Sequence, residues 1–244
     1  MKISMYPHLS INRVKHPSRL YAVPLFGIVA KIILLIPVFI ELAFLNITSF
    51  FVMIVGSFYI LFAKEYWRWE YDFFLKLMTF TAKISFYFAG LTDEYPGFSL
   101  KRANYFSLEI PYPKELNRMF AIPIAGFVVR FLLLIPFSIY RTIIQNGANL
   151  AVFVSWIPVL FSTYYPETTY EIFRDSLRLS LASTSYYAGL SDHYPSFSIS
   201  MNHKKLKVIL IIAGALLLLL HPSVFSGNNH SAYQQTMHRN NVRY

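Results

Sequence analysis

The sequence predicts an all-α integral membrane protein with two tandem repeats, each a transmembrane helical hairpin followed by an amphipathic interface helix, and then one C-terminal transmembrane helix. Hydrophobic residues make up 55% of the 244 residues and charged residues only 14%, whereas a soluble domain has about a quarter charged residues. The apolar residues lie in long blocks, which is the pattern of a multi-pass membrane protein. The chain also repeats itself, which indicates a duplicated unit.

Two stretches of the chain match each other without a gap at an interval of 99 residues. Residues 18–100 begin SRLYAVPLFGIVAKIILLIPVF and end AGLTDEYPGFSL, and residues 117–199 begin NRMFAIPIAGFVVRFLLLIPFS and end AGLSDHYPSFSI. Roughly 25 of about 82 aligned positions are identical, and self-similarity at a fixed period marks one supersecondary unit used twice. The chain is therefore divided into an N-terminal arm (1–17), repeat 1 (18–100), a linker (101–117) and repeat 2 (118–199).

Each repeat starts with a predicted helical hairpin. In repeat 1 the hairpin covers residues 21–63 and turns near residues 46–48; in repeat 2 it covers residues 119–163 and turns within residues 141–149. The first apolar run of each hairpin is long enough to cross a bilayer. The second run is at the short end of the spanning range, so a re-entrant hairpin that enters and leaves on one side is the alternative.

Proline stands at the same places in both repeats. Pro24 and Pro123 fall where the first helix would begin, a position that tolerates proline. Pro37 and Pro136 fall inside the first apolar run, where proline removes a backbone hydrogen bond. We expect both helices to be kinked there, which membrane helices accept when neighbouring groups bind the freed carbonyl.

An amphipathic helix is predicted after each hairpin, over residues 66–91 and 167–190. In the first of them, apolar residues recur every three or four positions, and both helices carry a stripe of charged residues. The stripes comprise Arg68, Asp72, Lys76 and Lys83 in the first helix and Glu167, Glu171, Asp175 and Arg178 in the second. Large rings on one face and charges on the other are typical of a helix that lies in the membrane interface.

The last apolar run predicts a transmembrane helix over residues 205–225. The polar tail that follows, 226–244, lacks the apolar surface needed to fold and is expected to be disordered. No cleavable signal peptide is apparent in the arm. Lys and Arg are concentrated in the arm, in the connection over 64–114 and at 203–207, and such residues mark the cytoplasmic side. Five spans then place the N-terminus and both interface helices inside and the C-terminus outside.

Both repeats close on the same motif, Gly-Leu-Thr/Ser-Asp-x-Tyr-Pro. The glycine is expected to end the amphipathic helix, the aspartate to close a local turn, and Tyr-Pro to extend the backbone. In this interpretation the motif is a helix stop with an aromatic anchor. Alternatively, the aspartates form ionic clamps with the two repeated arginines, Arg19 with Asp93 and Arg118 with Asp192.

Charged residues also lie inside the apolar runs. Lys31 and Arg130 occupy equivalent positions. Either their long side chains snorkel to the cytoplasmic headgroups, or they face an internal cavity and bind an anionic lipid or ligand. Glu41 is not repeated, and packing of the two hairpins would bring it to Arg141 as a cross-repeat ion pair; near a helix end, it is otherwise an interfacial residue.

Several classes of function are excluded or disfavoured. The chain has no cysteine, which excludes disulfides, thiolate metal sites, iron–sulfur clusters and cysteine nucleophiles. Histidines at metal-ligand spacing, a nucleophile elbow, a P-loop and a dinucleotide fingerprint are missing. The sequence therefore predicts no catalytic residue, no metal site and no cofactor. The net charge of +10 lies beside the apolar runs, which suits an anionic membrane surface rather than nucleic acid.

Four features of the repeats carry a resemblance to a known family. They are Tyr6-Pro7 in the basic arm, Arg or Lys followed by Leu-Leu-Ile-Pro, a short second run ending Leu-Phe, and the Gly-Leu-Thr-Asp-Glu-Tyr-Pro-Gly-Phe-Ser-Leu close. With these features both repeats resemble the bacterial membrane family catalogued as domain of unknown function 4389. His193 departs from the acidic residue common there. The resemblance implies a bacterial inner-membrane location, with the C-terminus in the periplasm, and no assigned activity.

Two functions stay open from the sequence. The first is a non-catalytic accessory or scaffold protein of an envelope assembly, which docks a membrane-protein partner through the C-terminal helix. The second is a transporter or lipid-handling protein, favoured by the duplicated units, the prolines inside apolar runs and the charges of Lys31 and Arg130. In both, the phospholipid bilayer and its anionic lipids are expected partners.

Overall fold

The computed structural model describes residues 7–11, 24–100, 103–113, 122, 125–162 and 165–220. Its elements in chain order are β1 (His8–Ile11), α2 (Pro24–Ala63), α3 (Arg68–Phe88), β2 (Phe106–Glu109), α4 (Ala125–Val154), α5 (Trp156–Ser162), α6 (Glu167–Tyr187) and α7 (Lys204–Leu219). The protein is mostly helical, and two segments are long and apolar enough to cross a membrane, Gly27–Ala63 and Ala125–Ser162. The tail predicted over 226–244 lies outside the described residues.

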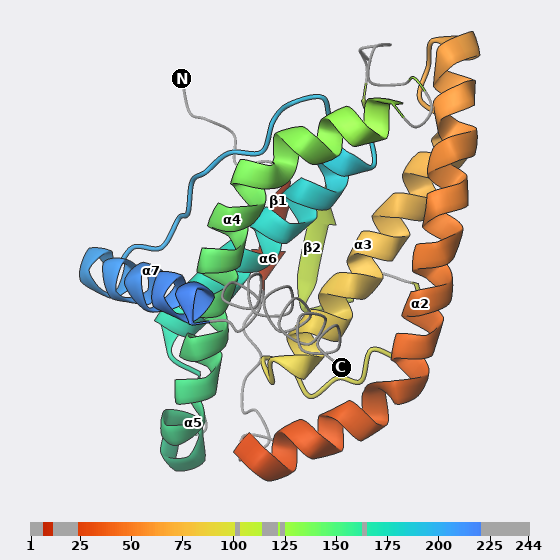
Figure 1. The fold of residues 1–244 in the computed structure, drawn as a ribbon. Helices are drawn as coiled ribbons and strands as arrows, with labels where there is room; N and C mark the ends of the chain where they lie inside the picture. Colours follow the sequence, from red (N-terminus) through yellow and green to blue (C-terminus); the bar gives the residue numbers. More distant parts are fainter. Residues whose placement is uncertain are drawn as a thin grey trace, which may run out of the picture.

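The first long helix, α2, runs without a break, so the hairpin predicted over residues 21–63 is wrong. The polar residues that suggest a turn lie inside the helix, where Asn46 and Thr48 donate hydrogen bonds to backbone carbonyls one turn earlier. Such bonding back to the helix accommodates polar side chains without ending it. Figure 1 shows that α2 is strongly bent. Pro37 lies inside it, and an interior proline removes a backbone hydrogen bond and bends a helix.

The second long helix, α4, also lacks the predicted turn. Residues 141–149 are helical, and their polar side chains bond to α4 itself, to α6 or to α7. The break comes later, at Ser155, between α4 and the short helix α5. Pro136 lies inside α4 at the position that matches Pro37 of α2. Two long helices with an internal proline therefore replace the two predicted hairpins.

Each long helix packs antiparallel against the amphipathic helix that follows it (Figure 1). At one end of the α2–α3 pair, Gly56 of α2 lies against Glu70 of α3. At the other end, the Lys31 Nζ atom lies 5.8 Å from the centre of the Tyr87 ring. The α4–α6 pair is arranged in the same way. In Figure 1, α3 and α6 lie side by side between α2 and α4.

The charged stripe of α3 is exposed over only part of its length. Arg68, Asp72 and Lys76 are exposed, as a helix at the membrane interface requires. Lys83 is buried and donates a hydrogen bond to the Ser99 carbonyl over 2.6 Å, so it does not belong to the stripe as predicted. Burial lowers the pKa of Lys83 below the usual value for lysine.

The charged stripe of α6 is covered by the chain itself. Asp175 accepts hydrogen bonds from the Ser200 backbone N–H over 2.5 Å and from its hydroxyl over 2.8 Å. Glu171 accepts from the Asn202 amide over 3.0 Å. Asp175, Glu171 and Arg178 are all buried, so the prediction that they face the headgroups is wrong; Glu167, at the start of α6, is exposed as predicted. Ser200 and Asn202, in the segment after the closing motif, donate the hydrogen bonds that water would give to an exposed stripe.

The C-terminal helix α7 crosses α4 where both helices carry glycine. Gly147 lies against the backbone of Leu210, and a side chain at Gly214 would overlap the Ile143 carbonyl. Small residues allow two helix backbones to approach closely. The helix predicted over residues 205–225 is present as α7, which ends at Leu219 with Leu220 as its C-cap and packs on its own chain.

One element was not predicted from the sequence. Strands β1 and β2 pair antiparallel, with His8 opposite Glu109 and Ile11 opposite Phe106. Phe106 and Leu108 are buried and Ser107 and Glu109 are exposed, which is the alternation expected of a half-buried strand. The ribbon joins the N-terminal arm to the linker and covers the α3–α6 layer.

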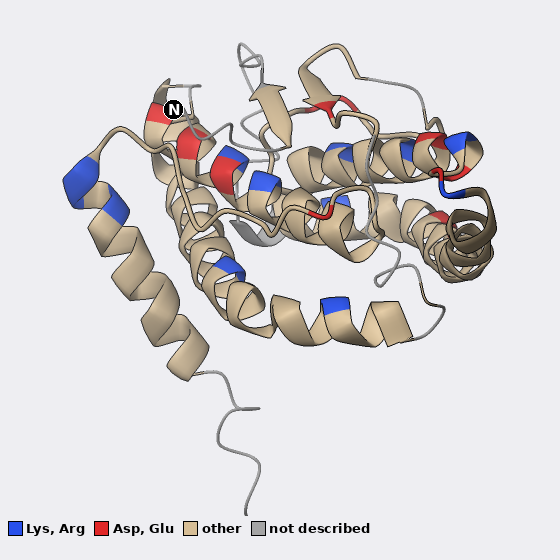
Figure 2. Cartoon of the chain, turned by 90° about the horizontal axis from the view of Figure 1, so that it is seen from above, with Lys and Arg blue, Asp and Glu red and all other residues tan. Residues whose placement is uncertain are grey.

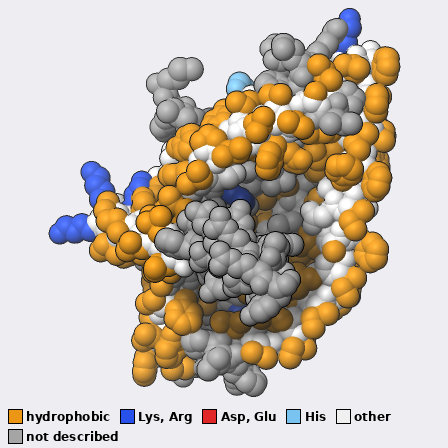
Figure 3. Space-filling model, viewed as in Figure 1, with side chains coloured by type: hydrophobic (Ala, Val, Ile, Leu, Met, Phe, Trp, Pro, Cys, Tyr) orange, Lys and Arg blue, Asp and Glu red, His pale blue; other side chains and the backbone are white. Residues whose placement is uncertain are grey.

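Charged and apolar side chains separate to opposite sides of the molecule. Figure 2 shows that most charged positions lie along α3 and α6, the side that carries the strands. Figure 3 shows the opposite face, where hydrophobic side chains cover α2, α4, α5 and α7 and no acidic side chain is visible. Large exposed hydrophobic residues of these helices include Phe44, Phe51, Phe62, Phe131, Phe161 and Leu219. An apolar face of this extent is typical of a surface that contacts lipid or another protein.

Candidate functional site

The two closing motifs end α3 and α6 with the same geometry. Gly90 has φ +73° and Gly189 has φ +77°, the left-handed region that favours glycine. The N–H of Leu91 donates to the Phe86 carbonyl over 3.0 Å, and the N–H of Leu190 donates across the same span over 2.9 Å. These are Schellman caps, so the predicted glycine helix stop is confirmed.

The local turn after each glycine is closed by the residue before the aspartate. The hydroxyls of Thr92 and Ser191 accept hydrogen bonds from the N–H groups of Glu94 and His193, each over 3.1 Å. A Thr or Ser hydroxyl can close a turn of this kind. The prediction that the aspartates close the turn is therefore wrong.

Asp192 instead pairs with a cation inside the long helix. Its carboxylate lies 2.5 Å from the Arg130 guanidinium, which also donates to the backbone carbonyls of Tyr186, over 2.5 Å, and Ser191, over 3.2 Å. The predicted partner, Arg118, lies outside the described residues. Arg130 is 3% exposed, so it neither snorkels to headgroups nor contacts lipid.

Lys31 occupies the matching place in the first half of the chain. It is 3% exposed and interacts electrostatically with Asp93, 99 residues before Asp192. The predicted clamp partner of Asp93, Arg19, lies outside the described part of the chain. Both cations inside apolar helices therefore face a closing motif. This position corresponds to neither the snorkelling nor the lipid-contact interpretation.

The tyrosine of each closing motif binds the same long helix. Tyr95 donates to the Leu34 carbonyl and Tyr194 to the Leu133 carbonyl, both over 3.0 Å. Each carbonyl stands three residues before the helix proline, next to the carbonyl that the proline leaves without its usual N–H donor. The motif thus binds the bent helix twice, through its aspartate and its tyrosine.

The predicted cross-repeat pair of Glu41 and Arg141 does not form among the described residues. Arg141 donates to the Ser180 hydroxyl over 3.2 Å. Glu41 acts electrostatically on Lys83 of its own half of the chain. The prediction assumed that two helical hairpins pack together; α2 and α4 are each one long helix instead, and the two residues contact different neighbours.

Contacts between the two halves are reciprocal. The hydroxyl of Tyr66 donates to the Ala188 carbonyl over 3.1 Å, and that of Tyr165 donates to the Ala89 carbonyl over 3.4 Å. Tyr165 stands 99 residues after Tyr66, and Ala188 stands 99 residues after Ala89. Each tyrosine therefore binds the end of the amphipathic helix in the other half.

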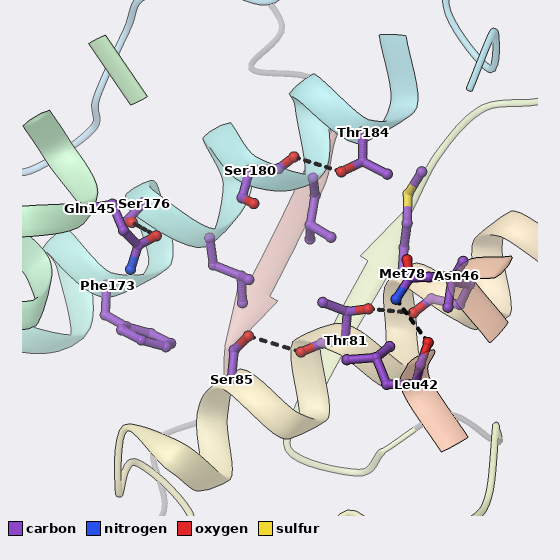
Figure 4. Close-up of a pocket in the computed structure, with 13 residues that line it drawn as sticks. Leu42, Asn46, Met78, Thr81, Ser85, Gln145, Phe173, Ser176, Ser180 and Thr184 are labelled. Carbon is purple, nitrogen blue, oxygen red and sulfur yellow. Dashed lines mark hydrogen bonds between the residues drawn. The ribbon is translucent and has the colours of Figure 1, made fainter. Parts of the chain in front are cut away.

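A cavity of about 200 Å³ lies between α3 and α6 (Figure 4). Asn46 of α2 lies at one end and Gln145 of α4 at the other. Much of the lining consists of residues at matched positions: Asn46 and Gln145, Leu77 and Ser176, Met78 and Leu177, Thr81 and Ser180, and Ser85 and Thr184. Asn46 and Thr184 are exposed, so the cavity opens to the surface.

The cavity offers hydrogen-bond acceptors and no charge. Its lining contains no Asp, Glu, Lys, Arg or His. The hydroxyl protons of Thr81, Ser85 and Thr184 are donated to carbonyls of their own helices, over 2.9, 2.8 and 3.1 Å. The lone pairs of the Thr81 and Thr184 hydroxyls are acceptors for a ligand. The two amides add a small number of further polar groups. A neutral molecule that donates hydrogen bonds fits this set.

The cavity residues could have been found from the sequence by applying the 99-residue interval to polar residues. Asn46 pairs with Gln145 and Thr81 with Ser180 under that interval, and small polar residues inside otherwise apolar elements are the signal. What the interval does not give is which face of each helix they occupy.

No family model, no curated protein and no solved structure matches this chain.

Proposed function

We propose that this chain is a membrane-embedded binding protein. Two equivalent units, residues 18–100 and 118–199, hold a neutral, hydrogen-bond-donating molecule between them, in the manner of a lipid-handling or transport protein of a bacterial inner membrane. The observation that carries the proposal is the cavity between α3 and α6, lined from both halves by matched uncharged polar residues. Repeats that frame a central site are the usual arrangement in transporters.

The helix pairing supports a proposed placement in the membrane. A 40-residue helix is about 60 Å long, whereas the hydrocarbon core is about 30 Å thick. Since α2 is antiparallel to α3, and α3 exposes Arg68, Asp72 and Lys76, α2 enters and leaves on the charged side. We place α4 likewise. Among the described helices, α7 is then the one proposed to cross, with the N-terminus in the cytoplasm and the C-terminus in the periplasm.

The cavity size limits the ligand. At about 200 Å³ it is smaller than a site for a drug-sized molecule, which takes about 300–1,000 Å³. A glycerol- or sugar-like group with several hydroxyls suits both the volume and the acceptors. The opening at Asn46, inside a helix that is apolar enough to lie in lipid, favours the head of a neutral lipid over a free polyol.

The test is binding of diacylglycerol to the purified full-length protein in nanodiscs, measured by native mass spectrometry. Thr184→Leu and Ser85→Leu fill the cavity, and each is expected to weaken binding at least about tenfold, since each leaves ligand hydroxyls unpaired. Thr48→Leu is the matched control, because Thr48 makes the same hydrogen bond within α2 but is exposed outside the cavity. It should bind like the wild type.

The outcomes distinguish a neutral lipid from a free polyol, and the cavity from the two buried cations, as the binding site. Competition by free glycerol at similar concentration indicates a polyol site rather than a lipid site. Binding that persists unchanged in both leucine variants excludes the cavity. Release of an anionic lipid by Lys31→Ala with Arg130→Ala, without any effect of the leucine variants, would point to the cations instead.

An accessory role in an envelope assembly is the second candidate. It is favoured by α7, whose face turned away from α4 exposes Val208, Ile212 and Leu216. A stoichiometric protein partner that is lost on deletion of residues 204–244, together with no lipid in the cavity, would make this role the better one.

A further inference from the structure

Glu70 is an acid in an apolar place. Its side chain is 2% exposed and is packed against Gly56 of α2, where any larger residue would overlap the carboxyl group. Its Oε2 atom has no hydrogen-bond partner among the described residues. A buried carboxylate without partners is costly, whereas the neutral acid is tolerated.

The hydrogen bonding of Tyr66 determines which group donates the proton in its contact with Glu70. Tyr66 is 2% exposed and within hydrogen-bonding reach of the Glu70 carboxyl. Its single hydroxyl proton is donated to the Ala188 carbonyl over 3.1 Å. Toward Glu70 the tyrosine therefore presents a lone pair, and only a protonated carboxyl can donate to it.

The second half of the chain lacks this acid. The positions that match Gly56 and Glu70 are Ser155 and Thr169, whose hydroxyls are 2.6 Å apart. Tyr165, which matches Tyr66, still donates to Ala89. In the second half of the chain, the long helix and the amphipathic helix thus pack together without an ionisable group. The acid Glu70 in the first half is therefore not required for this packing.

We propose that Glu70 is a proton-binding site that links the two halves of the protein, through a chain of donors from the Glu70 carboxyl to the Tyr66 hydroxyl and on to the Ala188 carbonyl. Loss of the proton leaves two acceptors facing each other at the first link. The chain is then broken next to the end of α6, which borders the central cavity.

The charges around this chain are few. Arg130 of α4 and Tyr112 act electrostatically on Tyr66, and Tyr66 is the group that acts on Glu70. Burial raises the pKa of Glu70 to about 8. Hydrogen bonding with Tyr66 acts in the opposite direction and is smaller than the effect of burial. Protonation and release therefore fall near neutral pH.

The test uses a hydrophobic carbodiimide, dicyclohexylcarbodiimide, which reacts with protonated carboxyl groups in apolar surroundings. Labelling of the full-length protein in native membranes is followed by intact mass. With a pKa of about 8, the protonated fraction falls about tenfold between pH about 6 and pH about 9. The adduct should fall by that factor and be absent in Glu70→Gln. Glu65→Gln, an exposed carboxylate of the same connection, is the control and should keep it.

The infrared band of a protonated carboxylic acid gives a second measurement that needs no reagent access. It should be present at pH about 6, lost in Glu70→Gln and retained in Glu65→Gln. An adduct that persists in Glu70→Gln, labelling that does not change with pH, or the absence of both adduct and infrared band overturns the proposal. None of these readouts depends on lipid in the cavity.

Discussion

The Arg130 guanidinium and the Asp192 carboxylate lie 2.5 Å apart, although 62 residues separate them in the chain. The arginine comes from the interior of an apolar helix and the aspartate from the loop that ends the next amphipathic helix. The contact fixes the bend of α4 to the end of α6. Lys31 and Asp93 face each other at the matching positions.

Breaking this pair should destabilise the protein more than removing both partners. Asp192→Ala leaves the buried Arg130 guanidinium without its carboxylate and is expected to lower the free energy of unfolding by about 3 kcal/mol. Arg130→Ala leaves a carboxylate that is partly exposed to solvent, so its loss should be smaller. A double-mutant cycle in detergent measures the coupling. His193→Ala, next to Asp192 but exposed, is the control. If the Arg130 and Asp192 losses simply add, the pair contributes nothing.

Gly90 is expected to tolerate alanine far less well than Gly97. Both have positive φ, +73° and +60°, so each substitution carries roughly 1 kcal/mol of backbone strain. At Gly90 the new Cβ would also lie 2.7 Å from Lys31 Nζ and from the Tyr165 hydroxyl. At Gly97 the space is open. Thermal unfolding of the two variants compares them, and equal losses would rule out close packing at Gly90.

Stability should fall as pH rises because of Glu70. Its pKa is about 8 in the folded protein and near 4.3 when unfolded. Between these values the folded state holds the additional proton, so the free energy of unfolding decreases with pH, by up to about 1.4 kcal/mol per pH unit. Above about 8 the dependence ends.

Thermal unfolding midpoints measured from pH about 5 to about 9 check this slope. Glu70→Gln should remove it, because glutamine donates to Tyr66 at every pH. Tyr165→Phe removes the reciprocal bond without touching the acid and should retain the slope. An unchanged slope in Glu70→Gln would assign the pH dependence to another group.

Cysteine labelling tests the proposed topology, and the chain suits it because it has no native cysteine. With α2 and α4 entering and leaving on one side, Lys101→Cys is expected to be protected from an impermeant maleimide added to the periplasm. Ser231→Cys should be labelled if α7 crosses. Labelling of Lys101→Cys would mean that α2 crosses the bilayer once.

The helical elements follow from sequence because their signals are local. Apolar length predicts α2 and α4, amphipathic periodicity predicts α3 and α6, and Gly90 and Gly189 mark where those two helices end. The turn predicted near residues 46–48 is wrong, and the reason is also local. Asn46 and Thr48 resemble turn residues, but their side chains satisfy carbonyls within the same helix.

The ionic contacts could not be predicted because they depend on tertiary placement. Asp192 was matched to Arg118, which lies outside the described residues, on the ground that both are repeated. Arg130 is repeated as well, and it is the residue that the fold brings to Asp192. Likewise nothing in the spacing of Glu171 and Asp175 shows that Ser200 and Asn202 return to cover them. A stripe of charges has the same appearance whether water or backbone amides bind it.

The exchange of tyrosine hydrogen bonds between the halves has a consequence for how such a chain can arise and diverge. Tyr66 binding Ala188 while Tyr165 binds Ala89 is the contact pattern of an isologous dimer, in which each subunit gives its partner the same bond. In a homodimer of single units, any substitution would appear twice. When the two copies are joined in one polypeptide, they are free to differ. Glu70 in one copy and Thr169 at the equivalent position of the other is a difference that no homodimer of identical subunits can have.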